Sequence, residues 1–363
     1  MADSIERRVQ EAWCDAQGID VVDCIHPEDE MYLLNDSMRP EGPRRRAEYM
    51  RTGYEPVLVL DHVLAHSGRT WADIGRLLEF ACGFGRTTRF LIQRVPAERI
   101  VSSDLLPGSV EWVTDRFGVS GLPSSPDPEK LELGGPFDLI YVGSLFSHLP
   151  RGRFEAFLRS LFEALTPEGL LVFTTHGADK IESMPKDPSG FTFHRESESR
   201  SLDVDEYGST FVAPRVMAEI ASGLGIRHIA RVDRHLWACQ DVWFASRTPL
   251  PVFPEDAPII RGGILRADVD TNGHGWVGGF TMVPADAGPV QRVRLRVGDS
   301  GFDALLSPPK ALPSGEPMLH QEWYLEGSLS FLEPGLHPLT ATALGTKGPA
   351  ICIGARELDV PAN

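Results

Sequence analysis

The residues with the clearest chemical potential are an acid and two glycines in the stretch LLEFACGFGRTTRFL, residues 77–91. The pattern predicts a buried strand that ends near Glu79, a turn that contains Gly83 and Gly85, and then the start of a helix. Such a junction presents free backbone N–H groups and the positive end of a helix dipole to a ligand. Glycine lets that ligand approach the backbone closely, because it carries no Cβ.

Two ligand classes fit this turn. A dinucleotide site requires a third glycine in the pattern G-x-G-x-x-G, and Thr88 stands at that position. Glu79 lies shortly before Gly83 and suits instead a ligand with a cationic amino-acid part. A plain strand–turn–helix corner that binds nothing is the structural alternative.

Further candidate ligand-binding residues follow two later segments that are predicted to be strands. Asp104 comes directly after residues 99–103, where nucleotide-binding folds keep an acid for ribose hydroxyls. Gly143 and Ser144 come directly after residues 137–142. Open α/β sheets bind ligands at the carboxyl ends of their strands, so we expect these residues to lie beside the glycine turn.

The part of the site that would hold an adenine is less clearly marked. Leu105 and Leu106 follow Asp104 and are placed to cover one face of a purine. Residues 118–135 contain three prolines, so only a short strand fits there. The candidates for the purine edge in this segment are Ser124, Ser125 and Asp127.

Two histidines and a tyrosine are the candidate catalytic residues. His148 and His176 each follow a predicted strand end, where an imidazole near neutrality is suited to accept a hydroxyl proton. In the alternative interpretation, each histidine satisfies local backbone groups. Tyr207 lies in residues 178–214, a long loop that we interpret as a lid over the substrate site.

These residues need a sheet that brings strand ends together, and the chain predicts one. From Arg76 onward, strand and helix patterns alternate, which is typical of a parallel sheet with helical crossovers. Residues 226–233 and 241–247 alternate as two final strands, in an antiparallel hairpin at the sheet edge. The predicted fold is an α/β, Rossmann-like, mostly parallel sheet with helices on both faces.

The two ends of the chain have a different character. Residues 1–70 are largely helical in pattern, with an apolar stripe of Ile5, Val9 and Trp13. After a proline-rich linker, short alternating segments with turn signals predict a separate all-β sandwich that folds independently. The predicted division is an N-terminal helical cap at 1–70, a ligand-binding domain at 71–248 with its lid at 178–214, and the β-sandwich at 249–363.

Composition narrows the class of protein. The chain has 363 residues, 42% of them hydrophobic, and a net charge of −16, which argues against nucleic acid as the main partner. Its five cysteines contain no C-x-x-C pair, which fits a reducing compartment. The chain shows neither an apolar signal core nor a segment apolar enough to span a bilayer, so we expect a soluble, cytoplasmic protein.

Three other patterns have mainly structural interpretations. The arginine run 44–46, with Arg51, fits an anionic group less well than a solvated helix face. His62 and His66 have the spacing of some zinc pairs, but no glutamate follows His62. Residues 268–273, DVDTNG, open like a calcium loop, but the closing acid is absent and Asn-Gly more simply predicts a hairpin turn. No metal site is predicted.

Over about residues 50–247 the chain resembles class I S-adenosylmethionine (SAM) methyltransferases, in particular a bacterial branch often associated with glycosyltransferases. The resemblance rests on LEFACGFGR, SSDLLPGSVEW, FDLIYVGSLFSHLP, LTPEGLLVFTTHG and SESRSLDVDEYGSTFVAP. LEFACGFGR is similar to motif I, D/E-x-G-x-G-x-G, with Ala81 in place of the first glycine. The resemblance implies SAM as the cofactor, held by Glu79, Ala81, Cys82, Gly83, Gly85, Asp104, Leu105, Gly143 and Ser144.

The sequence therefore predicts a methyltransferase that moves the SAM methyl to a small-molecule acceptor. A hydroxyl of a sugar or glycan is the predicted acceptor, by family association, with His176 or His148 as the base and Tyr207 beside them. One alternative is a catalytically degenerate module that binds a partner through the β-sandwich. Another is an NAD-dependent enzyme, which Thr88 disfavours. The oligomeric state is not predicted.

Overall fold

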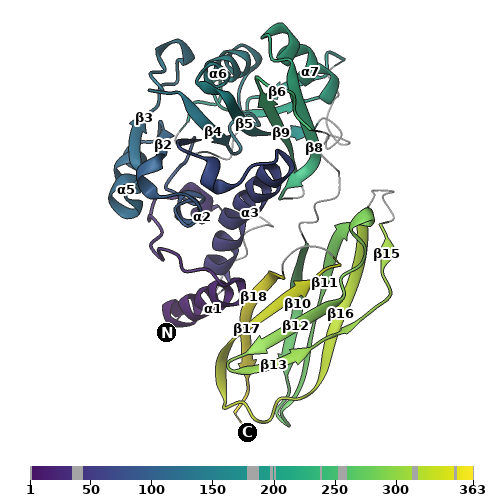
Figure 1. Cartoon of the computed structure of the whole chain (residues 1–363). Coiled ribbons are helices and arrows are strands. Elements are labelled where there is room, and N and C mark those ends of the chain that lie inside the picture. Colours follow the sequence, from purple (N-terminus) through teal and green to yellow (C-terminus); the bar gives the residue numbers. More distant parts are fainter. Residues whose placement is uncertain are drawn as a thin grey trace. The chain divides into compact units, whose positions relative to one another are not determined.

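Figure 1 shows the fold of the chain, which is known from a computed structural model. The structure describes residues 2–34, 44–177, 188–196, 199, 202–237, 239–251, 260–312, 318–346 and 350–362. They form two compact units that are not continuous in sequence. One unit contains residues 22–33 and 52–253, and the other contains residues 1–21, 34–51 and 254–363.

The unit that contains residues 52–253 is built on a nine-stranded sheet with the order β3-β2-β1-β4-β5-β7-β6, in which β9 pairs with β5 and β8. Strands β1 to β5 pair in parallel, and β9 runs antiparallel to β5. The predicted Rossmann-like sheet is confirmed. The strands are β1 Leu77–Phe80, β2 Ile100–Asp104, β3 Ser120–Pro123, β4 Phe137–Val142, β5 Leu165–Gly177, β6 Phe191–His194, β7 Ser209–Val212, β8 His228–Leu236 and β9 Gln240–Ser246.

The helices of this unit follow the strands along the chain, as the alternating pattern predicts. Their apolar faces bury residues such as Phe154, Phe157 and Leu161 of α6 against Leu78 and Ile140 of the sheet. The first helix after the glycine turn is only one turn long, and the residues on either side of it form turns. The helices are α4 Thr88–Leu91, α5 Ser109–Phe117, α6 Arg151–Glu163 and α7 Pro214–Gly223.

The segment 178–214 is not the single loop that the sequence predicts. Within it, β6 and β7 pair in antiparallel fashion, and β7 continues the sheet by pairing with the end of β5 at His176 and Gly177. Phe191 and Val212 pair across these two strands, and both are buried. Residues 178–187, 197–198 and 200–201 of the predicted lid lie outside the described residues.

The C-terminal strands form two antiparallel sheets with the orders β10-β11-β16-β14, in which β15 also pairs with β16, and β13-β12-β17-β18. The sheets share one core, to which Val277 and Trp323 contribute from the first sheet and Leu295 and Leu339 from the second. This is the predicted sandwich architecture. The strands are β10 Arg261–Val269, β11 His274–Pro284, β12 Arg292–Val297, β13 Ser300–Asp303, β14 Leu305–Leu306, β15 Lys310–Ala311, β16 Met318–Ser328, β17 Gly335–Leu344 and β18 Ile351–Val360.

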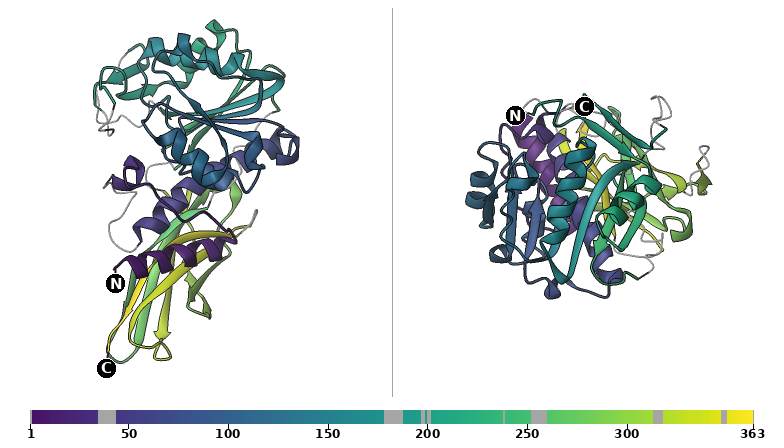
Figure 2. Two further views of the ribbon diagram at one scale, coloured as in Figure 1. Left: turned by 90° about the vertical axis from the view of Figure 1, so that its left-hand side faces the viewer. Right: turned by 90° about the horizontal axis from the view of Figure 1, so that it is seen from above.

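Helix α1 (Ala2–Gln17) packs on β17 and β18, and Figure 2 shows it in purple along these yellow strands. Its apolar stripe of Ile5, Val9 and Trp13 is buried, and the indole N–H of Trp13 donates to Cys352 O at 3.3 Å. The predicted stripe is therefore real, but its partner is the last sheet of the chain. The division at residues 70 and 249 remains a prediction.

Helix α3 (Arg45–His66) is continuous, although Pro56 lies inside it. Arg46 is almost fully buried and donates to Gln10 at 2.8 Å, while Arg51 pairs with Glu48 at 2.6 Å. The solvated-face interpretation is therefore wrong for Arg46. The short helix α2 (Glu30–Leu33) precedes α3. Among the described residues, no helix has the length and apolarity to cross a membrane.

Candidate functional site

A cavity of about 150 Å³ lies at the carboxyl ends of β1, β2 and β4. Most of the predicted ligand-binding residues meet there, as expected for an open α/β sheet. The predicted residues that line the cavity are Glu79, Ala81, Cys82, Gly83, Asp104, Leu105, Leu106, Gly143, Ser144 and Tyr207. The predicted residues that do not line it are Gly85, Ser124, Ser125, Asp127, His148 and His176.

The two glycines of the turn serve different purposes. A Cβ added at Gly83 would meet no protein atom within 4 Å, so this backbone faces open space beside the cavity. A Cβ added at Gly85 would lie 2.3 Å from the ring of Phe117. Both residues have a positive φ, which favours glycine. Gly83 therefore leaves room for a ligand, whereas Gly85 leaves room for a side chain of α5.

Three residues other than glycine have a left-handed backbone among the described residues: Ala81, Ser144 and Trp237, with φ of 62°, 64° and 53°. All three line the same cavity. Such conformations cost roughly 1–3 kcal/mol each and cluster at functional sites. Ala81 adopts the conformation in which glycine is the usual residue, so the departure from motif I keeps the backbone shape.

Glu79 is a buried carboxyl group at the base of the cavity. Thr88 Oγ1 donates to its Oε2 at 2.6 Å, and Ser102 Oγ lies 3.4 Å from the same oxygen. Burial raises the pKa of Glu79 from 4.5 to about 7, against the lowering effect of these two hydroxyls. A positively charged ligand in the cavity would favour the ionised carboxylate.

Asp104 joins the end of β2 to the glycine turn. Its Oδ2 accepts a hydrogen bond from Gly83 N at 2.7 Å, and its Oδ1 accepts one from Leu106 N at 2.8 Å. Burial raises the pKa of Asp104, although the backbone hydrogen bonds act in the opposite direction. The carboxylate therefore fixes the shape of the turn and also faces the cavity.

A second cavity, of about 80 Å³, adjoins the first at Ala81, Asp104, Leu105 and Tyr207. Apolar residues dominate its walls, and Ser124 from the end of β3 provides a hydroxyl. A flat aromatic ring with polar edges suits these walls better than a charged group. Sequence reasoning indicates Ser124 as a candidate for the purine edge. The other lining residues include Pro126, Leu145, Leu149 and Phe157.

His176 lies behind the cavity wall. Gln240 Nε2 donates to Ser144 Oγ at 2.7 Å and lies 3.5 Å from Nε2 of His176. The imidazole also stacks on Phe211, with ring centroids 5.1 Å apart. The chain Ser144–Gln240–His176 therefore connects a hydroxyl in the cavity to the imidazole, whereas direct contact with a ligand in this cavity falls to Ser144.

His148 has structural contacts. It is 4% exposed, and its Nδ1 donates to Gly208 O at 2.7 Å. Its ring stacks on Tyr207 with centroids 4.4 Å apart and an interplanar angle of 14°. This geometry matches the alternative in which His148 satisfies backbone groups. The imidazole positions Tyr207, which lines both cavities.

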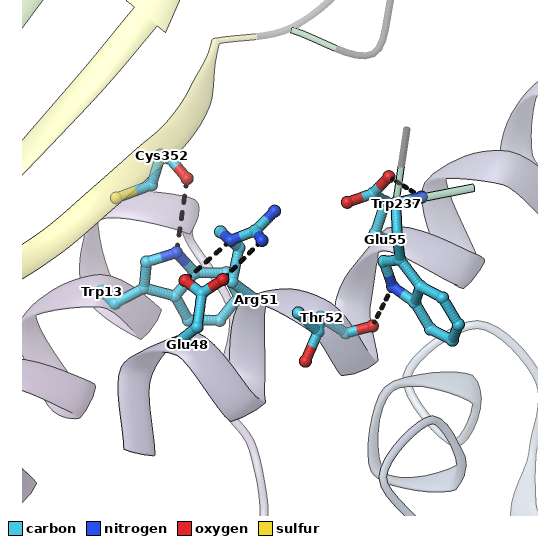
Figure 3. Close-up of polar contacts among 7 residues, drawn as sticks. All are labelled: Trp13, Glu48, Arg51, Thr52, Glu55, Trp237 and Cys352. Atoms are coloured by element: carbon cyan, nitrogen blue, oxygen red, sulfur yellow. Dashed lines mark hydrogen bonds and ion pairs between the residues drawn. The ribbon is translucent and has the colours of Figure 1, made fainter. Parts of the chain in front are cut away.

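Trp237, at the tip of the β8–β9 hairpin, is a cavity residue that sequence reasoning misses. Figure 3 shows its two hydrogen bonds to α3, from its backbone N–H to Glu55 Oε1 at 2.7 Å and from its indole N–H to Thr52 O at 2.9 Å. Pro56 has no N–H to offer Thr52 O, four residues earlier in α3. The indole N–H of Trp237 donates to this oxygen instead. A proline inside a helical pattern is therefore the sequence signal that points to such a contact.

A second missed element is the segment 22–33, whose residues Asp29, Glu30 and Met31 line the cavity. The buried Arg89 holds this segment, because its Nη1 donates to Val22 O at 2.8 Å and to Cys24 O at 2.9 Å. His26 stacks on Phe84, next to the glycine turn, with centroids 4.0 Å apart. The only signal in the sequence is an arginine among the apolar residues that directly follow motif I.

The metal patterns have structural explanations. Asp270 Oδ1 accepts hydrogen bonds from the N–H groups of Asn272 and His274 at 2.8 and 2.9 Å, which closes the predicted hairpin turn. His66 Nδ1 lies 3.0 Å from His62 O, in the last turn of α3. In the part of the chain that the structure describes, no three His, Cys, Asp or Glu residues gather as metal ligands.

Comparisons with known proteins agree with this geometry. Residues 77–169 match a family described as a methyltransferase domain. The chain is 29% identical over 131 residues to malonyl-[acyl-carrier protein] O-methyltransferase of Acetivibrio thermocellus, and this match covers 36% of the chain and 43% of the relative. It is 27% identical over 128 residues to the protein of that name in Bacillus cereus, covering 35% and 45%. The chain thus spans about half the length of these curated relatives.

A solved structure of human N-acetylserotonin methyltransferase in complex with SAM is similar over 55% of this chain and 56% of that chain. Its TM-score is 0.38 and its sequence identity is 13%. The family match over residues 77–169 supports a class I methyltransferase domain with SAM as its cofactor. The association with glycosyltransferases remains a prediction.

Proposed function

We propose that the protein is a SAM-dependent O-methyltransferase that acts on a small-molecule acceptor. The observation that carries this proposal is the cavity at the strand ends, where the open backbone at Gly83 meets the carboxyl groups of Glu79 and Asp104. A cationic amino-acid ligand suits both features.

The donor has a place for each of its parts. Glu79 and the turn around Gly83 hold the methionine part, and Asp104 faces the ribose. The smaller cavity, with Leu105 on one side and Ser124 at its edge, takes the adenine. Ala81 and Ser144 border the reacting end through their left-handed backbones. These assignments follow the carboxyl ends of β1, β2, β3 and β4 in turn.

SAM supplies an electrophilic methyl group on a sulfonium, and its product is a neutral thioether. The protein therefore contributes mainly position and exclusion of water. A hydroxyl acceptor also loses a proton. Tyr207 lines both cavities and is the side chain proposed to accept this proton, with His176 as the alternative base. Gln240 donates to Ser144 and lies beside His176, so it positions these two groups.

The oxygen that receives the methyl defines the acceptor class. The sequence resemblance suggests a hydroxyl of a sugar or glycan. The relatives named above act on a malonyl group on a carrier protein, and a malonyl group ends in a carboxylate. A hydroxyl and a carboxylate both attack through oxygen. The proposal is therefore O-methylation for either acceptor.

Two measurements test the proposal. Titration calorimetry should show binding of SAM and S-adenosylhomocysteine but not of NAD. Incubation with labelled SAM and separate panels of sugars and carboxylic acids should then produce methylated product and S-adenosylhomocysteine. Tight binding of NAD would refute the donor assignment. Binding of SAM without turnover on either panel would favour the non-catalytic module instead.

A further inference from the structure

One charged group of the larger cavity is not among the residues proposed above to bind the donor or to accept the proton. Arg86 is the sole basic residue among the described residues that line this cavity. Its guanidinium lies over the ring of Trp237, with Cζ 4.8 Å from the ring centroid. Its positive charge acts on the nearby Glu79 carboxyl, but within the described part of the chain this guanidinium makes no direct hydrogen bond or ion pair.

The backbone of Arg86 is held in place by α3. A Cβ added at Gly53 would lie 2.4 Å from Arg86 O, so glycine in the middle of this helix allows α3 to touch the turn. Trp237 is fixed from the same helix by its bonds to Thr52 and Glu55. Helix α3 therefore positions both Arg86 and the Trp237 ring over which it lies.

The remaining charges of the cavity have the opposite sign. The carboxyl groups that line it are those of Asp29, Glu30, Glu79 and Asp104. These groups suit the cationic donor, but they would repel an anion everywhere except at Arg86. A guanidinium that lies over an aromatic ring keeps its in-plane N–H groups available, and these match the two oxygens of a carboxylate.

On the basis of the proposed function, we infer that Arg86, supported by Trp237, binds a carboxylate of the acceptor. The acceptor is therefore a carboxylic acid, and the site selects it against neutral molecules of the same shape. In this reaction Arg86 determines the specificity for the acceptor, and Trp237 positions Arg86.

The experiment uses the full chain saturated with S-adenosylhomocysteine, so that the donor site is occupied. Calorimetry then measures the binding of acetate, hexanoate, benzoate and malonate monothioester, each paired with its neutral amide. At least one acid should bind at least about tenfold more tightly than its amide, since a charge-assisted hydrogen bond contributes about that factor. Arg86→Gln should remove the preference, and Arg86→Lys should keep part of it.

The matched control is Arg116→Gln. Arg116 also lies over an indole, that of Trp112, with the same 4.8 Å between Cζ and the centroid, but it lines neither cavity. This variant should keep the full preference for acids. Equal loss in both variants, equal affinity for acids and amides in the unmodified protein, or no binding of any acid would overturn the inference.

A separate arm distinguishes the carboxylate of the donor from that of the acceptor. Arg86→Gln should bind S-adenosylhomocysteine and 5′-methylthioadenosine, which lacks the amino-acid part, as tightly as the unmodified protein does. If the variant lost affinity only for S-adenosylhomocysteine, Arg86 would hold the donor and the inference would fail. If the unmodified protein bound neither nucleoside, the proposed function itself would fail.

Discussion

The backbone N–H of Trp237 donates to Glu55 Oε1 at 2.7 Å and so joins two residues that are 182 positions apart. Glu55 is 3% exposed, and it is the neighbour of Pro56, whose nitrogen carries no hydrogen for a bond to Thr52 O. Together the two contacts hold Trp237 at a φ of 53°, a conformation that a tryptophan rarely adopts. α3 thus shapes the wall of the cavity without lining it.

Loss of the Glu55 contact should impair use of the acceptor more than binding of the donor. Glu55→Ala removes a charge-assisted hydrogen bond of about 1.5–3 kcal/mol, so kcat/KM for the acceptor should fall about tenfold or more. Affinity for S-adenosylhomocysteine should change little. Glu55→Gln keeps an acceptor oxygen and should lose less. A parallel fall in affinity for S-adenosylhomocysteine would place the effect of Glu55 in the donor site.

The two glycines of the turn should respond differently to alanine. Gly83→Ala places a methyl group in open space beside the cavity, so donor affinity should fall about tenfold while the protein stays folded. Gly85→Ala forces a contact with Phe117 and should mainly lower the free energy of unfolding, by about 1–3 kcal/mol.

Gly68→Ala controls for backbone strain in this comparison. Gly68 also has a positive φ and open space where the alanine methyl group would lie, but it is outside both cavities. Its variant should show the strain cost without the loss of donor binding. Calorimetry and chemical unfolding measure the two effects. Equal losses of donor affinity at positions 83 and 68 would contradict the role of Gly83.

The raised pKa of Glu79 predicts two pH dependences. Its pKa is 4.5 in the unfolded chain and about 7 in the folded protein, so the folded state binds the proton more tightly. This contribution to stability is fully present below pH 4.5 and is lost as the pH rises through about 7. Glu79→Gln should flatten the dependence of the unfolding free energy on pH across this window.

Binding of SAM should follow the opposite trend. Its positive charge favours ionised Glu79, so affinity should rise with pH toward about 7 and binding should release a proton. Calorimetry in buffers with different ionisation enthalpies measures that proton. Its continued release in Glu79→Gln would assign it to another group.

Asp104 should be required for the donor because it organises the turn as well as facing the ribose. Asp104→Ala leaves the N–H groups of Gly83 and Leu106 without their acceptor and should weaken SAM binding at least about tenfold. Asp104→Asn keeps one acceptor oxygen and should lose less. Unchanged affinity in Asp104→Ala would exclude Asp104 from the donor site.

Trp13 should be important for stability and not for the donor. It is 1% exposed and donates to Cys352 O, as Figure 3 shows. Trp13→Ala should lower the free energy of unfolding by about 3–5 kcal/mol. The control is Trp276→Ala in β11, which should lower the free energy of unfolding by less, because Trp276 is only half-buried. An unfolding free energy that is unchanged in Trp13→Ala would refute the packing of α1 on β18.

The sequence predicts those parts of the site that are each marked by a short local pattern. The acid, the turn and the strand ends around Glu79, Asp104 and Ser144 are local signals, and the parallel sheet brings them to one edge. The glycine pattern assigns Gly85 to the ligand, because such a pattern does not distinguish the close approach of a ligand from that of the Phe117 ring.

The missed parts depend on contacts between distant segments. Trp237 reaches the cavity through α3, and segment 22–33 through Arg89, and neither partner is marked by spacing along the chain. The apolar stripe of α1 predicts that this helix is buried, but periodicity does not reveal which surface covers it. The strands β6 and β7 were hidden in a polar segment because each contributes only four residues.

The packing of α1 on β17 and β18 has a consequence for biosynthesis. Trp13 and Cys352 are separated by 339 positions, so the apolar face of α1 leaves the ribosome long before its covering strands are made. During that interval the apolar face of α1 has no covering strands, and the central sheet becomes complete in sequence only when β9 has been made. Chaperone demand should therefore concentrate on this helix, and closure of so long a loop should be a late event in folding.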